Sequence, residues 1–294
     1  MPANSTTKPV RIGDHLVGPG EPCFVTAEIG INHNGDLETA KKLIDVAVET
    51  GCQAVKFQKR TVSVVYTEDE LARPRESPFG DTNGDLKRGL EFDVAQYSEI
   101  DAYCQERGIL WFASCWDEGS VDFIEQFQPP CYKFASASLT DDDLLRHHAK
   151  TGRPLILSTG MSTLDQIDHA VEILGTDNLI ILHATSTYPT KTDELNLRAI
   201  NSLQARYGVP VGYSGHEVGL QTSVAAVALG ACMVERHITL DRAMWGSDQA
   251  ASVEPQGFER LVRDIRVVQE ALGDGVKQVY QSEIPVMNKL RRVG

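Results

Sequence analysis

Short apolar segments alternate with amphipathic segments along almost the whole chain. Near-continuous apolar runs are typical of parallel strands that are covered on both faces. Eight such runs predict strands at 24–30, 54–58, 109–115, 132–137, 154–160, 179–185, 209–214 and 233–239. The regular spacing of these runs indicates one repeated structural unit.

The segments between the runs carry apolar residues at every third or fourth position, which predicts helices. These helices are expected at 37–47, 95–107, 118–127, 139–150, 164–174, 197–207, 220–229 and 257–272. Eight strands, each followed by a helix, predict an α/β fold, the closed (β/α)8 or TIM barrel. An open doubly wound sheet is the alternative, but no Gly-x-Gly-x-x-Gly motif follows the first strand.

Two segments lie outside this repeat. Residues 10–17 predict a small hairpin within an N-terminal extension, 1–20, which leaves 21–294 as the barrel domain. Residues 59–91, after the second strand, form a long insertion rich in Pro, Gly and charge. A loop at this position lies on the face where barrel active sites are found, so it is either a lid or a disordered insertion.

Composition narrows the class of partner. The chain has 28 basic and 41 acidic residues, a net charge of −13, so nucleic acids and anionic membranes are unfavourable partners. No apolar run is long enough for a transmembrane helix, and the first ten residues lack the apolar core of a signal peptide. Six scattered cysteines without a Cys-x-x-Cys pair predict a reduced, cytoplasmic protein.

Polar residues cluster where the predicted strands end. In a barrel, the carboxyl ends of the strands surround the active site. The residues at or just after these ends include Glu28, Lys56, Gln58, Ser114, Lys133, Ser136, Ser158, Ser186, Tyr188, Ser214, His216, Glu235, His237 and Asp248. This set predicts one polar site at the mouth of the barrel.

The types of residue in this set indicate the chemistry. Lys56 and Lys133 lie in apolar strands, where an ammonium group is costly to bury unless an anion compensates it. Serine hydroxyls could donate hydrogen bonds to phosphate oxygens. His216 and His237 follow adjacent strands and could bind one metal ion while leaving positions open for Lewis-acid catalysis.

Simpler interpretations exist for each of these residues. A strand lysine can be part of a salt bridge, a lone histidine is often a hydrogen-bonded structural residue, and serine is a common helix N-cap. Two more histidines, His147 and His148, lie on the predicted helix 139–150 and are expected to be solvated.

Several motifs in order resemble the sialic acid synthase family. They are AEIGINHNG (27–35), VKFQ (55–58), YKFAS (132–136), LSTGMS (157–162), TSTYP (185–189), GYSGH (212–216) and ERHITLDR (235–242). Members of that family condense phosphoenolpyruvate with a mannose-type amino sugar to give a nine-carbon 2-keto-3-deoxy acid. The resemblance extends from residue 21 to about residue 292 and implies a metal-dependent transferase.

The resemblance also implies a role for each site residue. Phosphoenolpyruvate would be bound by Lys56, Ser114, Lys133, Ser136, Ser158, Ser186 and Ser214. A divalent ion, Mn²⁺ or Mg²⁺, would be held by His216 and His237, which are catalytic together with Glu28. Gln58, Tyr188 and Asp248 would face the sugar. The resemblance further implies a homodimer.

The sequence does not identify the acceptor sugar. The chain ends at Gly294, whereas typical members add a small C-terminal antifreeze-like domain that caps a neighbouring subunit's site. Ser138 and Gly215 stand where many members have an acidic residue. One alternative is a synthase that accepts a sugar phosphate, which would need a second phosphate site. No extra Arg-Lys cluster lies at a strand end, and only the basic pairs Arg73–Arg75 and Lys87–Arg88 in the insertion keep this alternative open. The other is a non-catalytic barrel, which the intact lysine and histidine set disfavours.

Overall fold

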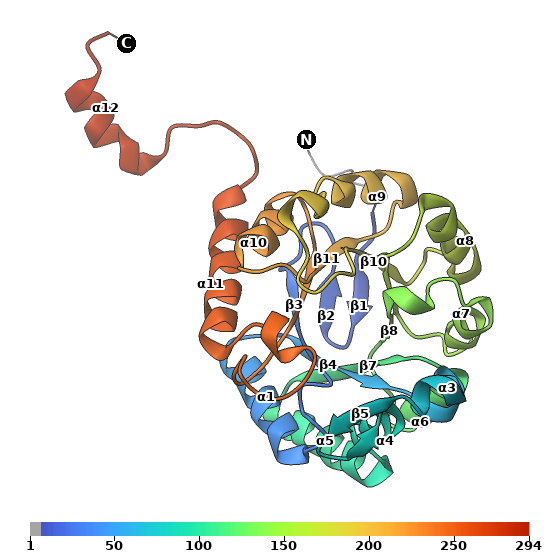
Figure 1. Cartoon of the computed structure of the whole chain (residues 1–294). Helices are drawn as coiled ribbons and strands as arrows, with labels where there is room; N and C mark the ends of the chain where they lie inside the picture. Colours follow the sequence, from blue (N-terminus) through green and yellow to red (C-terminus); the bar gives the residue numbers. More distant parts are fainter. Residues whose placement is uncertain (1–6, 294) are drawn as a thin grey trace.

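Eight parallel strands close into a barrel in the computed structural model, which describes residues 7–293 (Figure 1). The strands are β3 (Phe24–Gly30), β4 (Ala54–Lys59), β7 (Leu110–Cys115), β8 (Tyr132–Phe134), β9 (Leu155–Ser158), β10 (Leu179–Ala184), β11 (Val211–Gly215) and β12 (Met233–His237). Strand β12 pairs with β3 and closes the ring. The predicted (β/α)8 barrel is therefore confirmed.

One helix follows each strand and packs around the ring. These helices are α1 (Leu37–Glu49), α5 (Val94–Arg107), α6 (Glu118–Glu125), α7 (Asp142–Ala149), α8 (Leu164–Leu174), α9 (Ala199–Tyr207), α10 (Gln221–Ala228) and α11 (Pro255–Leu272). Side-chain caps define several starts: Asp36, Asp93 and Thr163 each accept a hydrogen bond from the backbone three residues later. Helix α7 begins later than predicted because residues 136–138 form a 3-10 turn, η1 (Ser136–Ser138), and Asp141 then caps the helix.

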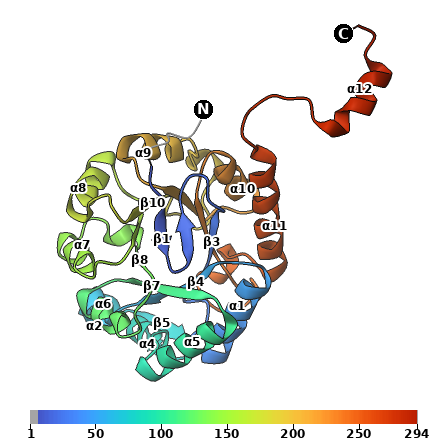
Figure 2. The same cartoon turned by 180° about the vertical axis from the view of Figure 1, so that it is seen from behind.

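A short hairpin closes the amino end of the barrel. It consists of β1 (Val10–Ile12) and β2 (His15–Val17), paired in antiparallel register. Figure 2 shows the hairpin lying across this end of the barrel. Val10, Ile12 and Val17 are buried and pack with residues near the strand starts, including Phe24 and Phe112. The opposite, carboxyl end is left for the polar residues.

The insertion after β4 is folded. It contains α2 (Val62–Val65), α3 (Glu68–Leu71), a hairpin of β5 (Pro74–Ser77) and β6 (Gly80–Thr82), and α4 (Asn83–Gly89). Its two ends are tied together by Arg60, which donates from its backbone and its side chain to the Glu91 carboxylate. The interpretation as a disordered insertion is therefore wrong, whereas the lid stays a prediction.

The chain continues beyond the barrel's last helix. After Leu272 it runs away from the ring through a 3-10 turn, η4 (Gln281–Glu283), and α12 (Ile284–Leu290), as Figure 1 shows. This segment belongs to the predicted range 21–294 but lies outside the ring of helices. Among the described helices, none is both long and apolar enough to span a lipid bilayer.

Candidate active site

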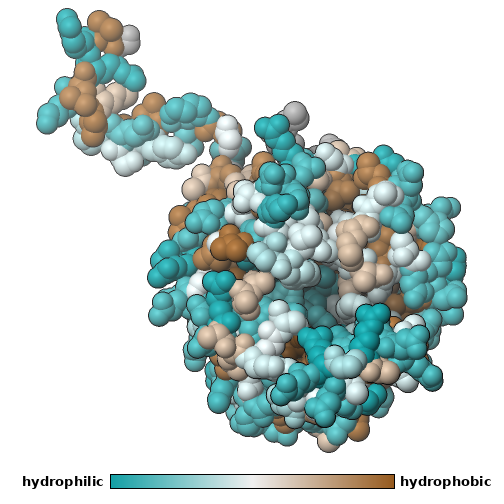
Figure 3. Space-filling view, in the orientation of Figure 1, coloured by the Kyte–Doolittle hydropathy of each residue, from teal (hydrophilic) through white to brown (hydrophobic). Residues whose placement is uncertain are grey.

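A cavity of about 250 Å³ opens at the carboxyl end of the barrel, and we call it the barrel cavity. Figure 3 shows the hollow near the centre of this face. It is lined by nearly all the predicted site residues: Glu28, Lys56, Gln58, Ser114, Lys133, Ser136, Ser158, Ser186, Tyr188, Ser214, His216 and His237. The fold therefore brings residues from all eight strand ends to one place.

Strand alternation explains which side chains reach the barrel cavity. Successive residues of a strand point to opposite faces. On β4, Lys56 and Gln58 face the cavity, while Phe57 packs in the outer core. Parallel pairing sets Glu28 beside Lys56 and Ser114 beside Lys133. The polar set is thus a direct consequence of strand register.

Each buried lysine is paired with a buried carboxylate. Lys56 Nζ lies 2.6 Å from Glu28 Oε2, and Lys133 Nζ lies 3.2 Å from Glu235 Oε1. All four side chains are at most 6% exposed. Both lysines are therefore salt-bridged, and the four charges sum to zero when all are ionised.

Hydroxyl groups complete this array. Lys56 Nζ donates to Ser114 Oγ at 3.0 Å, and Ser214 Oγ donates to Glu235 Oε1 at 2.9 Å. Ser136 and Ser158 are joined by a hydrogen bond of 3.1 Å between their hydroxyls. These groups can reorient toward an entering anion without adding charge.

The two buried carboxyl groups have different affinities for protons. Burial raises the pKa of Glu28 to about 7, although Lys56 opposes the shift. Burial also acts to raise the pKa of Glu235, but the charges of Lys133 and Lys56 outweigh it and lower that pKa to about 2. Two nearby carboxyls with separated pKa values are the usual arrangement for an acid–base site, in which one exchanges a proton and the other stays ionised.

The two histidines lie side by side at one edge of the barrel cavity. Their ring centroids are 5.8 Å apart, and the Tyr188 ring lies 4.2 Å from that of His216. Burial lowers both histidine pKa values to about 4, so both rings are neutral near pH 7. Neutral imidazole is the form that binds metal ions.

Hydrogen bonding leaves ring nitrogens available to a metal. His216 Nδ1 lies 2.9 Å from the Thr185 carbonyl, to which it donates, so Nε2 keeps its lone pair. His237 Nδ1 is buried and has no hydrogen-bond partner. Within residues 7–293, no group of three or more His, Cys, Asp or Glu side chains is arranged to hold a metal ion. The two imidazoles therefore supply two of the ligands that a divalent ion would need.

Comparison with known proteins identifies the family. The sequence model of the NeuB family matches residues 43–277, which is most of the chain. The chain belongs to the NeuB family. The resemblance to sialic acid synthases and the prediction of an enzyme of that type are thereby confirmed.

Individual relatives of this NeuB-family chain are named synthases. It is 42% identical to the N-acetylneuraminate-9-phosphate synthase of Homo sapiens over 279 residues, 93% of this chain and 78% of that protein. It is 37% identical to the N,N'-diacetyllegionaminic acid synthase of Campylobacter jejuni over 277 residues, 92% of this chain and 83% of that protein. The crystal structure of an N-acetylneuraminic acid synthetase from Leptospira borgpetersenii superposes with a TM-score of 0.85 at 30% identity, covering 98% of this chain and 99% of the other.

Not every residue of the cavity was singled out from the sequence. Trp116 and Met161 line the barrel cavity and were not predicted, and Glu235, which was noted at the end of its strand without a role, lines it too. Glu235 could have been given a role, since it precedes His237 by two residues and therefore faces the same side of β12. Asp248 does not line the cavity. Its negative charge acts to raise the pKa of His237, so Asp248 lies near the cavity's edge.

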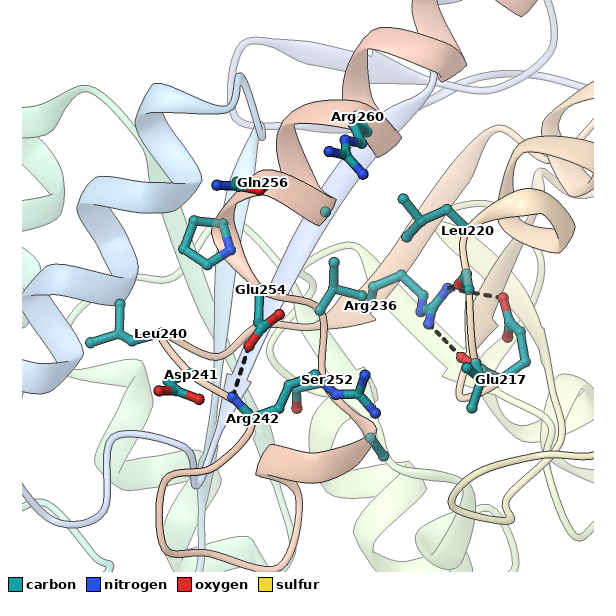
Figure 4. Close-up of a pocket in the computed structure, with 16 residues that line it drawn as sticks. Glu217, Leu220, Arg236, Leu240, Asp241, Arg242, Ser252, Glu254, Gln256 and Arg260 are labelled. Atoms are coloured by element: carbon teal, nitrogen blue, oxygen red, sulfur yellow. Dashed lines mark hydrogen bonds and ion pairs between the residues drawn. The ribbon is translucent and has the colours of Figure 1, made fainter.

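A larger cavity, of about 640 Å³, lies outside the strands between the starts of α10 and α11 (Figure 4). Its buried charges are already satisfied: Arg236 Nη1 donates to Glu217 Oε1 at 2.9 Å, and Nη2 donates to the Glu217 carbonyl at 2.7 Å. Arg236 points away from the barrel cavity because it alternates with Glu235 and His237. The chemistry of the lining, rather than cavity volume, therefore makes the barrel cavity the candidate active site.

Proposed function

We propose that this chain condenses phosphoenolpyruvate with an open-chain aldose, N-acetylmannosamine or a related hexose, to give a nonulosonic acid and phosphate. The observation that carries the proposal is the pair of buried lysines and their serine hydroxyls beside two neutral imidazoles in one cavity. The names of the relatives, which are synthases of nine-carbon sugar acids, support the same reaction class.

Lys56 and Lys133 would bind the phosphate and carboxylate of phosphoenolpyruvate, helped by the serine hydroxyls. Lys56 must then exchange its partner Glu28 for the entering anion, whereas Lys133 keeps Glu235 beside it. Because burial raises the pKa of Glu28 to about 7, Glu28 can take up a proton and leave Lys56 free for the ligand. Glu235, with its low pKa, stays ionised beside Lys133.

In the reaction, a bond forms between C3 of phosphoenolpyruvate and the aldehyde carbon, water adds at C2, and the C2–O bond to phosphate breaks. Glu28 is the group with a suitable pKa to move a proton to or from the reacting oxygens. A Mn²⁺ or Mg²⁺ ion on His216 and His237 would polarise the aldehyde oxygen as a Lewis acid. Gln58 donates to Glu28 Oε1 at 3.1 Å and holds this carboxyl in place beside the sugar.

The family resemblance also supports a homodimer, and the six cysteines without a Cys-x-x-Cys pair support a cytoplasmic location. Light scattering on the purified chain tests the dimer directly, since a homodimer has twice the mass of the 32.3 kDa protomer.

A phosphate-release assay tests the reaction. The enzyme receives phosphoenolpyruvate, Mn²⁺ or Mg²⁺, and one acceptor from a panel of N-acetylmannosamine, mannose, diacetamido-trideoxyhexoses and arabinose 5-phosphate. We expect phosphate release that requires both the metal ion and a hexose. This release should be lost when the metal ion is chelated and in the His216→Ala/His237→Ala variant. His147→Ala, on the outer surface, is the matched control.

The outcomes separate the alternatives. Phosphate release with arabinose 5-phosphate and with no other acceptor of the panel would indicate a synthase of another 2-keto-3-deoxy sugar acid. No release with any acceptor, or full activity in the double histidine variant, would contradict the proposal.

A further inference from the structure

A buried asparagine connects the loop after β3 with the loop after β12. Asn32 lies four residues beyond Glu28, is 1% exposed and does not line the barrel cavity. We propose that Asn32 is a positioning residue for the acceptor sugar, which holds residues 238–253, here called the β12 loop, so that Asp248 lies beside His237. The inference rests on the proposed synthase function and adds to it a residue that acts from outside the cavity.

The side-chain amide of Asn32 donates both of its hydrogens to the β12 loop. Asn32 Nδ2 lies 2.7 Å from the Ile238 carbonyl and 2.8 Å from Ser252 Oγ. Ser252, on the stretch that leads into α11 (Figure 4), in turn donates from Oγ to the Asp248 carbonyl at 2.6 Å. A continuous chain of hydrogen bonds therefore runs from Asn32 to the main chain of Asp248.

A second buried amide connects the same two loops in the opposite direction. Gln249, also 1% exposed, directly follows Asp248 and donates from Nε2 to the Asn32 carbonyl at 3.0 Å. Gln249 Oε1 accepts a hydrogen bond from the Thr239 hydroxyl, near the start of the β12 loop. The residue next to Asp248 is therefore fixed both to the loop after β3 and to the first residues of its own loop.

The loop after β3 is firmly packed, whereas the β12 loop is largely exposed. His33, next to Asn32, is 2% exposed, and its ring stacks on the Phe92 ring at 4.1 Å. His33 Nδ1 also accepts a hydrogen bond from the Gly35 backbone at 3.0 Å. By contrast, most residues in 241–247 are exposed. Because this part of the β12 loop has little apolar burial, its position depends on hydrogen bonds such as those of Asn32.

The position of Asp248 affects the acceptor side of the active site. The Asp248 carboxylate is close enough to His237 for its charge to act on the ring. Lys56 and Lys133, which would bind phosphoenolpyruvate, lie on β4 and β8 and take no part in the hydrogen bonds of Asn32. A displaced β12 loop would therefore weaken binding of the sugar and leave binding of phosphoenolpyruvate unaltered.

Ser252→Ala tests the connection with the smallest change. It removes one hydroxyl between Asn32 and Asp248 and adds neither bulk nor charge. With the acceptor of the panel that supports the fastest phosphate release, we expect the KM for the sugar to rise by about three- to tenfold, as for the loss of one hydrogen bond. The KM for phosphoenolpyruvate should not change. Asn32→Ala should raise the sugar KM at least as much, because it removes both donations.

A double-mutant cycle with Asp248→Asn separates positioning from general stability. If Ser252 acts through Asp248, Ser252→Ala should not raise the sugar KM further in the Asp248→Asn background. An equal rise in both backgrounds would overturn the inference, because the hydroxyl would then affect the site by another route. A matching rise in the KM for phosphoenolpyruvate would also overturn it.

Asn201→Ala is the matched control. Asn201 Nδ2 also donates to a backbone carbonyl, that of Leu229 at 2.7 Å, but it connects α9 with the end of α10. We expect wild-type KM values for both substrates in this variant. A rise in the sugar KM equal to that in Ser252→Ala would overturn the inference, since any lost asparagine or serine hydrogen bond would then have the same effect.

Hydrogen exchange supplies a readout that does not depend on turnover. In Asn32→Ala and in Ser252→Ala we expect faster exchange in residues 241–252 and unaltered exchange in residues 74–82. Unaltered exchange in 241–252 would show that Asn32 does not hold the β12 loop and would overturn the inference.

The results distinguish this inference from the proposed function. A wild-type sugar KM in Ser252→Ala would overturn the role of Asn32 and leave the synthase intact. If no acceptor supports phosphate release, the proposed function fails, and calorimetric titration with N-acetylmannosamine then decides the role of Asn32 together with hydrogen exchange. Weaker sugar binding in Ser252→Ala than in the wild type would support that role, whereas equal or undetectable binding in both proteins would overturn it.

Discussion

At the scale of single residues, burial decides which side chains are charged. His148 is fully buried, with its ring 5.2 Å from that of Tyr132 and 4.4 Å from that of Phe134. Its Nδ1 lies 3.0 Å from the Leu144 carbonyl one turn earlier. The expectation that His148 is solvated is therefore wrong, and burial lowers its pKa to about 4.

This histidine predicts a pH dependence of stability. Between about pH 6.5 and pH 4 the unfolded chain takes up a proton at His148 and the folded chain does not, so the free energy of unfolding falls as pH falls. The loss is as much as about 3 kcal/mol. Urea unfolding should show a shallower pH dependence for His148→Phe than for the wild type. Parallel pH profiles for the two proteins would show that His148 titrates normally in the folded state.

The types of the active-site residues could be predicted from the sequence, but their pairing could not. Lys56, Lys133, His216 and His237 stand out because they are polar positions in or directly after apolar runs. The partnership of Lys133 with Glu235 joins two strands that are not neighbours in the barrel, so it depends on how the ring closes. Strand pairing and closure are tertiary properties, which hydrophobic periodicity does not contain.

At the scale of elements, the strands and helices of the barrel follow the local hydrophobic pattern, whereas the insertion does not. Periodicity placed most barrel elements within a few residues of their bounds. The sequence of the insertion predicts a loop because it is rich in Pro, Gly and charged residues. It is ordered by contacts with distant residues, among them the Phe79 ring against Gly89 and Gly35.

Gly89 is expected to be necessary for this arrangement. A Cβ at position 89 would lie 2.1 Å from Phe79 Cγ, so Gly89→Ala must displace the ring. We expect faster hydrogen exchange in residues 74–82 and a higher KM for the acceptor, with the KM for phosphoenolpyruvate unchanged. Gly119→Ala is the control, since its nearest contact would be 3.2 Å. Unaltered exchange in Gly89→Ala would show that Phe79 does not anchor the hairpin.

At the scale of the whole molecule, stability and chemistry lie at opposite ends of the barrel. The β1–β2 hairpin packs its apolar residues against the strand starts, and the polar cavity occupies the strand ends. Such a division is usual for barrel enzymes, in which one face carries the active site and the other contributes stability.

This division predicts that the hairpin can be weakened without altering the active site. Ile12 is fully buried at the amino end, so Ile12→Ala should lower the free energy of unfolding by about 2–5 kcal/mol. The KM values for phosphoenolpyruvate and acceptor should stay at wild-type levels below the unfolding transition. A higher KM in a variant that is still folded would argue that the two ends are coupled.

The most direct test of the whole account is the affinity for phosphoenolpyruvate, measured by calorimetry in the wild type and in Lys133→Met. A second variant, Lys133→Met/Glu235→Gln, avoids leaving a buried carboxylate unpaired, and Lys150→Met on the surface is the control. We predict that both Lys133 variants bind phosphoenolpyruvate at least about tenfold more weakly, because a buried charge-assisted contact is lost. Lys150→Met should match the wild type. Wild-type affinity in both Lys133 variants would contradict the placement of phosphoenolpyruvate in the barrel cavity.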